Sequence, residues 1–316
     1  MYKSHAIIVC VPAYNEEAHI AGVIRAMPDF VDHIIVVDDK SADRTLEVAQ
    51  NTPDPRLILI ASPVNQGVGG SIITAYKRAL ELPAAQENNA IAVKMDGDGQ
   101  MRPEYLPLLL NKIIDEKFDY AKGNRFFETT YLRQMPRLRI LGNIGMTFLT
   151  KLASGYWNIF DPQNGYTAIS RNALQTLPLD KIYRRYFFEN DMLIHLNIDH
   201  RRVADVPIPA HYAAERSKLS ITRTTASFPF LILRGGLTRI FQKYILRDFS
   251  PIALFLITGF LMLLWSFIFG SIVWIRSIAT NTAAPTGTIM LVVIPLILGF
   301  QLTLQAITLD IQNTPK

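Results

Sequence analysis

Residues 91 to 100 read Ile-Ala-Val-Lys-Met-Asp-Gly-Asp-Gly-Gln. The first five are almost wholly apolar, which is typical of a short strand buried in a parallel sheet. Asp96 and Asp98 follow directly, so both carboxylates would leave the sheet at the carboxyl end of this strand. Ligands of open α/β sheets bind beyond such ends, and closely spaced carboxylates there can hold a hard divalent cation. The stretch therefore predicts a metal-assisted pyrophosphate site on an α/β sheet.

Two other structures begin with the same residues. Asp-Gly is a common turn dipeptide, so the pair alone also fits a solvated turn. A calcium loop of the EF-hand type opens with Asp-x-Asp as well, but it needs a Gly after the third ligand and a Glu at position twelve. Met101 and Pro107 stand at those two positions, which argues against the calcium loop.

The first hundred residues alternate strands and helices, as consecutive βαβ units do. Strands are expected at 6–11, 33–37 and 57–61, and the first helix at 16–27 with Asn15 as its N-cap. The glycine run 65–71 opens a later helix. It matches neither GxGxxG nor a P-loop, so we expect it to pack that helix start tightly on the sheet rather than to bind phosphate.

Polar segments follow the first, second and fourth predicted strands, at residues 11–17, 37–43 and 95–100. The carboxyl ends of parallel strands share one edge of a sheet, so these segments are expected to converge. Three acidic or polar loops at such an edge favour a nucleotide site.

The distribution of charge divides the chain into parts. Charged residues are spread over 1–248 and nearly vanish from 251 to 309. We expect a soluble domain at 1–226, amphipathic interfacial helices at 227–249, and a membrane segment at 250–316. That segment would hold two transmembrane helices, at about 251–275 and 287–309.

Basic residues predict the orientation of this hairpin. Four precede the first span, namely Arg234, Arg239, Lys243 and Arg247, whereas the link between the spans holds only Arg276. The positive-inside rule then predicts a multi-pass protein of the cytoplasmic membrane with its soluble domain in the cytoplasm.

Composition also bears on partners. The net charge of +5 is modest and no dense basic arm with interleaved aromatics is present, so nucleic acid is not an expected partner. The single Cys10 excludes an intramolecular disulfide. A two-span hairpin leaves helix faces free for self-association, so a homo-oligomer is a possible assembly.

Three motifs now carry a family resemblance: Pro12-Ala-Tyr-Asn-Glu16, Val36-Val-Asp-Asp39 and Asp96-Gly-Asp98. In this order and spacing they resemble the family 2 glycosyltransferases, which have a Rossmann-like A-type fold. Further segments, with the C-terminal spans, resemble the branch typified by dolichol-phosphate mannose synthase and bacterial polyprenyl-phosphate glycosyltransferases. These segments are Lys122-Gly-Asn-Arg125, Asp161-Pro-Gln-Asn-Gly-Tyr166 and Ser217-Lys218.

The resemblance implies a role for each matching position. Nucleotide-sugar contacts fall on Pro12, Tyr14, Glu16, Asp39, Asp96 and Gln100. Mg²⁺ or Mn²⁺ would be held by Asp96 and Asp98, with Gln100 as a further ligand. Lys40 departs from the pattern, because the family usually has Gly at this place in the turn.

A membrane-facing loop and helix would present Arg125, Arg137 and Arg139 to the acceptor phosphate, and the resemblance adds Arg216 and Lys218. Arg matches phosphate through two parallel hydrogen bonds, which suits a lipid phosphate at a membrane face. A buried helix with a solvated basic flank is the alternative for 133–156, and nothing chooses between Arg137 and Arg139. His211 is an alternative to Arg216.

Catalytic roles are expected for Asp98, Asp161, Arg125 and Asp191. Glu189-Asn190-Asp191 occupies the place where many family members carry an acidic base, although a helix-surface carboxylate fits Glu189 and Asp191 equally well. A phosphate monoester is already ionised near neutral pH, so these carboxylates would position a substrate rather than move a proton.

The sequence thus predicts a metal-dependent, inverting transfer of a hexose from a nucleotide sugar to a polyprenyl phosphate at the cytoplasmic face. UDP-hexose and GDP-mannose both fit, with a slight preference for UDP. A processive polysaccharide synthase is one alternative, but its Gln-x-x-Arg-Trp motif is absent. A membrane-anchored nucleotide-sugar sensor without turnover is the other.

Overall fold

The computed structural model describes residues 1–83, 89–125, 137–209 and 221–315. The described chain forms two compact units, one of residues 1–237 and one of residues 238–314. The division lies inside helix α10 (Ile221–Arg239), eleven residues beyond the expected domain end at 226.

The first unit is built on a seven-stranded sheet in the order β3-β2-β1-β4-β6-β5-β7. Its strands are β1 (Ala6–Ala13), β2 (His33–Asp38), β3 (Leu57–Ala61), β4 (Ala90–Lys94), β5 (Tyr120–Asn124), β6 (Thr167–Ser170) and β7 (Val203–Pro207). Only β6 runs antiparallel to its neighbours β4 and β5. The expected α/β fold with a mostly parallel sheet is confirmed.

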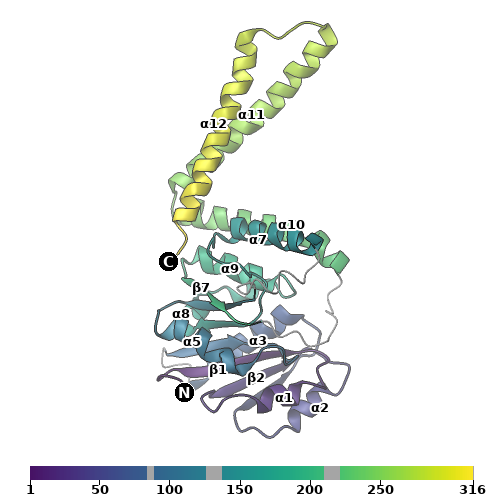
Figure 1. The fold of residues 1–316 in the computed structure, drawn as a ribbon, viewed down its shortest axis with the longest axis vertical. Coiled ribbons are helices and arrows are strands. Elements are labelled where there is room, and N and C mark those ends of the chain that lie inside the picture. The colour runs from purple at the N-terminus through teal and green to yellow at the C-terminus, as the bar shows by residue number, and fades with distance from the viewer. Residues whose placement is uncertain (84–88, 126–136, 210–220, 316) are drawn as a thin grey trace. The chain divides into compact units, whose positions relative to one another are not determined.

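Helices cover both faces of this sheet (Figure 1). Alternate residues of β1 serve the two faces, since Ile8 and Cys10 belong to one core cluster while Ile7 and Val9 belong to the other. One face carries α3 (Val68–Glu81), α8 (Arg171–Thr176) and α9 (Phe188–Ile198). The opposite face carries α1 (Ile20–Arg25), α2 (Thr45–Gln50) and α5 (Leu106–Ile114), which follows the short η1 (Pro103–Tyr105).

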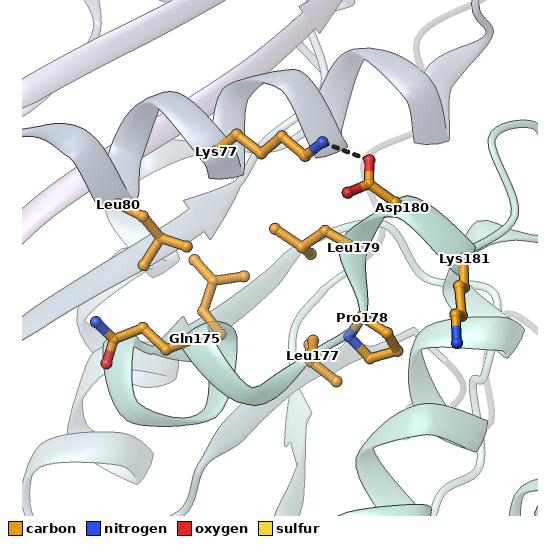
Figure 2. Close-up of a pocket in the computed structure, with 9 residues that line it drawn as sticks. Lys77, Leu80, Gln175, Leu177, Pro178, Leu179, Asp180 and Lys181 are labelled. Atoms are coloured by element: carbon orange, nitrogen blue, oxygen red, sulfur yellow. Dashed lines mark hydrogen bonds and ion pairs between the residues drawn. The ribbon is translucent and has the colours of Figure 1, made fainter.

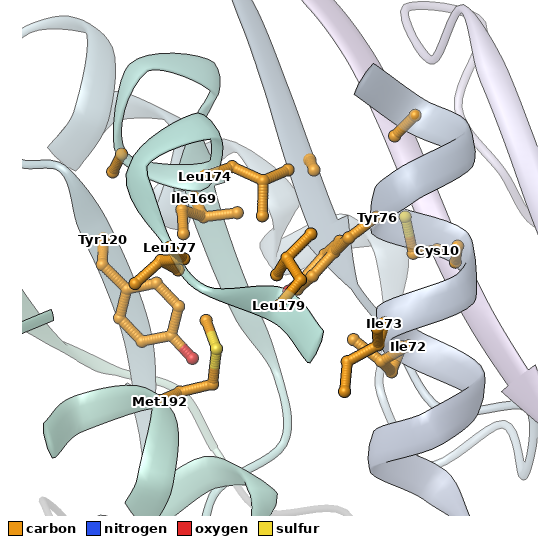
Figure 3. Packing of buried hydrophobic residues seen from close by; sticks show 14 of the residues in the cluster. Cys10, Ile72, Ile73, Tyr76, Tyr120, Ile169, Leu174, Leu177, Leu179 and Met192 are labelled. Atoms are coloured by element: carbon orange, nitrogen blue, oxygen red, sulfur yellow. The ribbon is translucent and has the colours of Figure 1, made fainter. Parts of the chain in front are cut away.

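The core under α3 and α9 is closely packed. Figure 3 shows Tyr76 and Ile72 of α3 across from Leu177, which follows α8, and Met192 of α9, all in one core cluster on the same face of the sheet. Cys10 lies wholly buried among them, and burial raises the pKa of its thiol. The lone cysteine is therefore a core residue, as its apolar setting in the sequence indicated.

Helix α7 (Arg137–Ser154) and helix α10 pack outside α9. Phe187, before α9, meets Phe228 of α10 edge to face at 5.6 Å between ring centroids. The outward sides of α7 and α10 stay apolar although they are exposed, and we call this set the apolar face: Ile144, Phe148, Leu149, Leu152, Phe230, Leu233 and Leu237.

The second unit contains a π-helical segment η3 (Ile240–Arg247), then α11 (Pro251–Thr280) and α12 (Thr286–Gln312). Both long helices are apolar and long enough to cross a membrane. They extend beyond the expected 251–275 and 287–309. They touch closely at Gly259 and Gly299, where a Cβ on Gly259 would lie 3.0 Å from the Gly299 carbonyl oxygen.

Candidate active site

The predicted site segments meet at one edge of the sheet. The carboxyl ends of β1, β2, β4 and β5 share this edge, and β6 begins there because it runs the other way. The loops after those strands and the segment Asp161–Tyr166 before β6 are therefore neighbours. The convergence expected from the sequence is confirmed for the first, second and fourth strands.

The loop after β1 is tied to the loop after β2. Asn15 has a left-handed φ of 56°, its side-chain oxygen accepts from the Ala42 N–H at 2.8 Å, and its own N–H donates to the Ser41 hydroxyl at 3.0 Å. It does not cap a helix, as α1 begins only at Ile20, and the predicted helix start at Glu16 was wrong. Residues 14–19 form a turn that leaves Tyr14 exposed at the edge.

Asp39 anchors the glycine run. Its two carboxylate oxygens accept from the backbone N–H of Gln66 at 2.7 Å and of Gly67 at 2.8 Å. Asp39 is also buried. In this structure its visible task is to hold the loop before α3, so the predicted nucleotide contact remains a prediction.

Asp38 is a site candidate that the sequence analysis passed over. It is buried, one carboxylate oxygen accepts from the Ser41 N–H at 3.2 Å, and the other has no hydrogen-bond partner among the described residues. A buried polar atom without a partner is costly, which makes Asp38 a further candidate for the site. The doubled aspartate in the sequence was the signal that pointed to it.

The turn that follows forms even though Lys40 replaces the usual glycine. Lys40 adopts a left-handed φ of 58°, which a residue with a side chain reaches at about 1–2 kcal/mol. The loop bonds of Asp39 and Asn15 on either side hold the turn closed. The departure from the family pattern therefore leaves the local fold intact.

The glycine run packs tightly, as expected, but against the segment before α9. A Cβ on Gly69 would lie 2.6 Å from the Tyr183 carbonyl oxygen, and the Gly70 N–H donates to the Arg184 carbonyl oxygen at 2.8 Å. Gly67 has φ 82°, and a Cβ there would lie 2.9 Å from the Arg184 carbonyl oxygen. These glycines thus couple the start of α3 to the start of α9.

The Asp-Gly-Asp turn supplies oxygen donors. One Asp98 oxygen accepts from the Gln100 N–H at 3.0 Å, and burial, with the nearby charges of Asp96 and Glu16, raises the pKa of Asp98. Such crowded carboxylates suit a hard cation such as Mg²⁺ or Mn²⁺. In the described part of the chain no three His, Cys, Asp or Glu side chains are grouped to hold a metal, so phosphate oxygens would have to complete the set.

Arg125 and Asp161 form a two-fold ion pair. The guanidinium donates from Nε at 2.7 Å and from Nη2 at 3.0 Å, and the Arg125 N–H adds a third bond at 3.1 Å. Burial opposes ionisation of Asp161, but these bonds and the Arg125 charge hold its pKa below the ordinary value. The structure thus joins two predicted residues and shows Asp161 as the partner that orients Arg125.

Glu189 and Asp191 point to different surroundings. Glu189 lies 3.3 Å from Lys94 Nζ beneath the Asp-Gly-Asp turn. Asp191 accepts from the Tyr183 N–H at 2.8 Å and lies 3.6 Å from His195. Residues two apart on a helix do not share a face. The structure therefore brings Glu189 rather than Asp191 toward the predicted metal residues, and the predicted catalytic role of Asp191 finds no support in this geometry.

The family model for glycosyl transferase family 2 matches residues 8–177, more than half of the chain. The chain belongs to glycosyltransferase family 2. The matched stretch holds the loops after β1, β2 and β4 as well as Arg125 and Asp161, whereas Glu189 lies beyond its end.

Relatives of this glycosyltransferase carry the names of lipid-phosphate enzymes. It is 33% identical over 221 residues to the UDP-N-acetylglucosamine–dolichyl-phosphate N-acetylglucosaminyltransferase of Methanococcus voltae, covering 65% of this chain and 86% of the relative. It is 27% identical over 207 residues to the undecaprenyl-phosphate mannosyltransferase of Micrococcus luteus, covering 64% and 82%.

A solved structure shares the fold of the glycosyltransferase. The glucosyl-3-phosphoglycerate synthase of Mycobacterium tuberculosis, determined with Mn²⁺, UDP and its product, superposes with a TM-score of 0.55. The two sequences are 22% identical, and the match covers 75% of this chain and 80% of the synthase. This likeness confirms the A-type architecture.

Part of the predicted acceptor site cannot be placed. His211, Arg216, Ser217 and Lys218 lie outside the residues that the structure describes. Arg137 and Arg139 lie in the first turn of α7, but their side chains are not among those described. Their predicted contacts with a phosphate stay predictions.

A separate pocket of about 360 Å³ lies between α3 and the segment of α8 and η2 (Leu179–Lys181) (Figure 2). Its lining is mainly apolar, and Lys77 pairs with Asp180 at 2.5 Å across its rim. Because α3 runs away from the strand ends where it begins, Lys77 and Leu80 lie toward the opposite edge of the sheet. This pocket is not the active site of the glycosyltransferase.

Proposed function

We propose that this glycosyltransferase transfers one sugar from a nucleotide donor to a polyprenyl phosphate at the cytoplasmic face of a membrane, with inversion at the anomeric carbon. The observation that carries the proposal is the joining of the Asp-Gly-Asp turn and the Arg125–Asp161 pair at one sheet edge, in a chain that also has two membrane-length helices. The names of the two lipid-phosphate relatives support the same acceptor class.

The donor would lie across the loops after β1, β2 and β4. Asp38 ends β2 at this edge with one buried carboxylate oxygen unpartnered among the described residues, and Tyr14, after β1, is exposed at the same edge. A bound Mg²⁺ or Mn²⁺ would neutralise charge that develops on the leaving diphosphate. Asp96 and Asp98, with Gln100 beside them, are the residues that would hold it.

The acceptor needs orientation rather than deprotonation. A lipid phosphate is already an anion near neutral pH, so its oxygen can attack the anomeric carbon while the diphosphate leaves on the opposite side. Arg125 is fixed in place by Asp161 and presents a guanidinium at the same edge. We assign the orientation of the lipid phosphate to Arg125, and no side chain is required as a general base.

Two features support a membrane location. The apolar face on α7 and α10 leaves large side chains such as Phe148 and Phe230 exposed, which suits contact with lipid. Helices α11 and α12 have the length and composition of spans. The excess of basic residues before α11 favours a cytoplasmic catalytic unit, where nucleotide sugars are made.

UDP-N-acetylglucosamine is the first donor to test, because a relative one-third identical to this chain is named for it. UDP-glucose and GDP-mannose follow. UDP donors are thus favoured over GDP donors, and the candidate sugars include N-acetylhexosamines as well as hexoses.

The test uses purified protein in detergent with undecaprenyl phosphate, Mn²⁺ and each radiolabelled donor, followed by extraction of labelled lipid. One donor should give lipid-linked label that EDTA abolishes. Asp98→Ala should lower the rate at least about a hundredfold, since metal stabilisation of a leaving phosphate is worth several kcal/mol.

Near-normal turnover by Asp98→Ala would overturn the metal assignment. Absence of lipid-linked label from every donor, together with tight donor binding, would replace the proposed transfer with the sensor hypothesis. Glu104→Ala, which removes an exposed carboxylate from η1, is the matched control and should transfer at the normal rate.

A further inference from the structure

A row of polar side chains crosses the sheet just beneath the active site. Lys94 of β4 pairs with Thr167 of β6, Thr167 pairs with Lys122 of β5, and Lys122 pairs with Asp205 of β7. Paired residues on neighbouring strands point to the same face. Both lysines are almost wholly buried, with side-chain exposure of 1% or less. Two buried ammonium groups in one sheet require a specific explanation.

Lys94 joins three segments of the site. Its Nζ donates to Asp96 Oδ1 at 2.7 Å and to the Gly165 carbonyl oxygen at 3.3 Å, and it lies 3.3 Å from Glu189 Oε1. An ammonium group has three hydrogens, and these three acceptors match that number. The loop after β4, the segment before β6 and the start of α9 are thus held by one atom.

The space around this atom is reserved for it. A Cβ on Gly165 would lie 2.4 Å from Lys94 Nζ and 3.0 Å from Asp96 Oδ2. Any side chain at position 165 would therefore displace the ammonium group or the carboxylate. With Oδ1 engaged by Lys94, the remaining oxygen Oδ2 is the one left to face a ligand, and Asp96 keeps 30% of its side-chain surface exposed.

Lys122 is a second buried lysine, which does not bond to Asp96. It lies in the same row and is equally buried, but its Nζ donates to the Asn164 carbonyl oxygen rather than to a carboxylate of the Asp-Gly-Asp turn. Loss of either lysine removes one buried positive charge. Only the loss of Lys94 frees the Asp96 carboxylate to rotate.

We propose that Lys94 is a positioning residue that fixes the rotamer of Asp96 for binding of a divalent cation with a nucleoside diphosphate. The inference rests on the proposed function, because it concerns the same donor site. Glu189 is the counter-ion of Lys94 and holds the ammonium group from the side of α9. Supporting groups of this kind typically change metal affinity ten- to a hundredfold when they are removed.

The test measures binding of Mn²⁺ in the presence of UDP, and separately of GDP, by the detergent-purified full chain, using the electron paramagnetic resonance signal of free Mn²⁺. Lys94→Met, which keeps the length but not the charge, should weaken binding at least about tenfold. Lys122→Met is the matched control. It should change Mn²⁺ binding less than about twofold although it, too, loses a buried charge. Equal weakening by the two variants, or unchanged binding by Lys94→Met, overturns the proposal.

A double variant separates positioning from charge balance. Lys94→Met with Glu189→Gln removes the buried charge pair together, so its melting temperature should recover toward that of the natural protein while Mn²⁺–nucleotide binding stays weak. It also keeps the test valid if Lys94→Met alone does not fold. Recovery of binding in the double variant would show that Lys94 only balances Glu189.

Measurements on the natural protein distinguish failure of the proposed function from failure of the Lys94 role. If the natural protein binds neither Mn²⁺–UDP nor Mn²⁺–GDP, the proposed function and the role of Lys94 fall together. If the natural protein binds and Lys94→Met binds equally well, only the role of Lys94 falls.

Discussion

Asp205 of β7 lies at the end of the polar row, and its carboxyl group has a raised pKa. Burial raises its pKa to about 6, although one carboxylate oxygen accepts from Asn124 Nδ2 at 2.6 Å and from the Phe160 N–H at 3.2 Å. A carboxyl pKa above the unfolded value of about 3.9 means that ionisation disfavours the folded state. The stability that the neutral form contributes is therefore present below about pH 4 and is lost as the pH rises through 6.

Asp205→Asn removes this pH-dependent loss. Between pH 5 and 7.5 the variant should gain roughly 1 kcal/mol relative to the natural protein, which corresponds to a few degrees in melting temperature. Thermal unfolding in detergent at both pH values measures the difference. Asp29→Asn, on an exposed loop, controls for the loss of a carboxylate as such. A gap between natural protein and Asp205→Asn that is the same at both pH values would contradict the assignment.

The sequence predicted the site residues that belong to a recognisable motif, but not those that act by positioning another side chain. Asp96 and Asp98 follow a strand directly, so their place at the sheet edge could be predicted. Lys94 was read as part of an apolar strand, because its partner Glu189 is ninety-five residues away. Asp191 was preferred to Glu189 because the amino-acid sequence does not show which side of α9 faces the sheet.

At the scale of elements, the glycines of two helices play opposite parts. Gly69 in the first turn of α3 abuts the Tyr183 backbone, whereas Gly22 in α1 has nothing within 4 Å of an added Cβ. Gly69→Ala should cost about 1–3 kcal/mol through overpacking. Gly22→Ala should instead stabilise by about 1 kcal/mol, because alanine loses less conformational entropy in a helix.

Relative to the natural protein, the melting temperature should fall for Gly69→Ala and rise for Gly22→Ala. A Gly69→Ala protein as stable as the natural one would show that α3 can move away from the segment before α9. Binding of the nucleotide donor is a second measurement for Gly69→Ala. Asp39 accepts a hydrogen bond from the Gly67 N–H, so a shift of this loop should also move Asp39.

Strands and their order of appearance followed from apolar runs, but several boundaries did not. Strand β1 continues through Pro12 to Ala13, because neighbouring β2 still pairs with it there. Helix α1 is shorter than its amphipathic pattern, since the side chain of Asn15 bonds to the loop after β2 instead of to its own helix. Both differences come from contacts between loops, which no local pattern records.

At the scale of the whole molecule, orientation across the membrane is open to a direct test. Cys10 is the only cysteine and is fully buried, so single cysteines can be introduced without removing it. Ala283→Cys lies between α11 and α12, and Gln50→Cys lies at the end of α2; both positions are exposed. In right-side-out vesicles, a membrane-impermeant maleimide should label Ala283→Cys alone.

Permeabilised vesicles should label both variants, which confirms that each thiol is reactive. Labelling of Gln50→Cys from outside, with Ala283→Cys protected, would reverse the proposed topology and place the catalytic unit away from the pool of nucleotide sugars. The arginine at 276, near the end of α11, would then be on the cytoplasmic side despite the basic residues that precede α11.

The close contact between Gly259 and Gly299 limits which substitutions the hairpin tolerates during evolution. Each glycine lies against the other's carbonyl oxygen, at 3.0 and 2.9 Å from an added Cβ, so a larger residue at either place pushes the helices apart. On the outer sides of α11 and α12, by contrast, many apolar side chains serve lipid equally well. In descendants of this protein we expect the hairpin to change almost everywhere before it changes at these two positions.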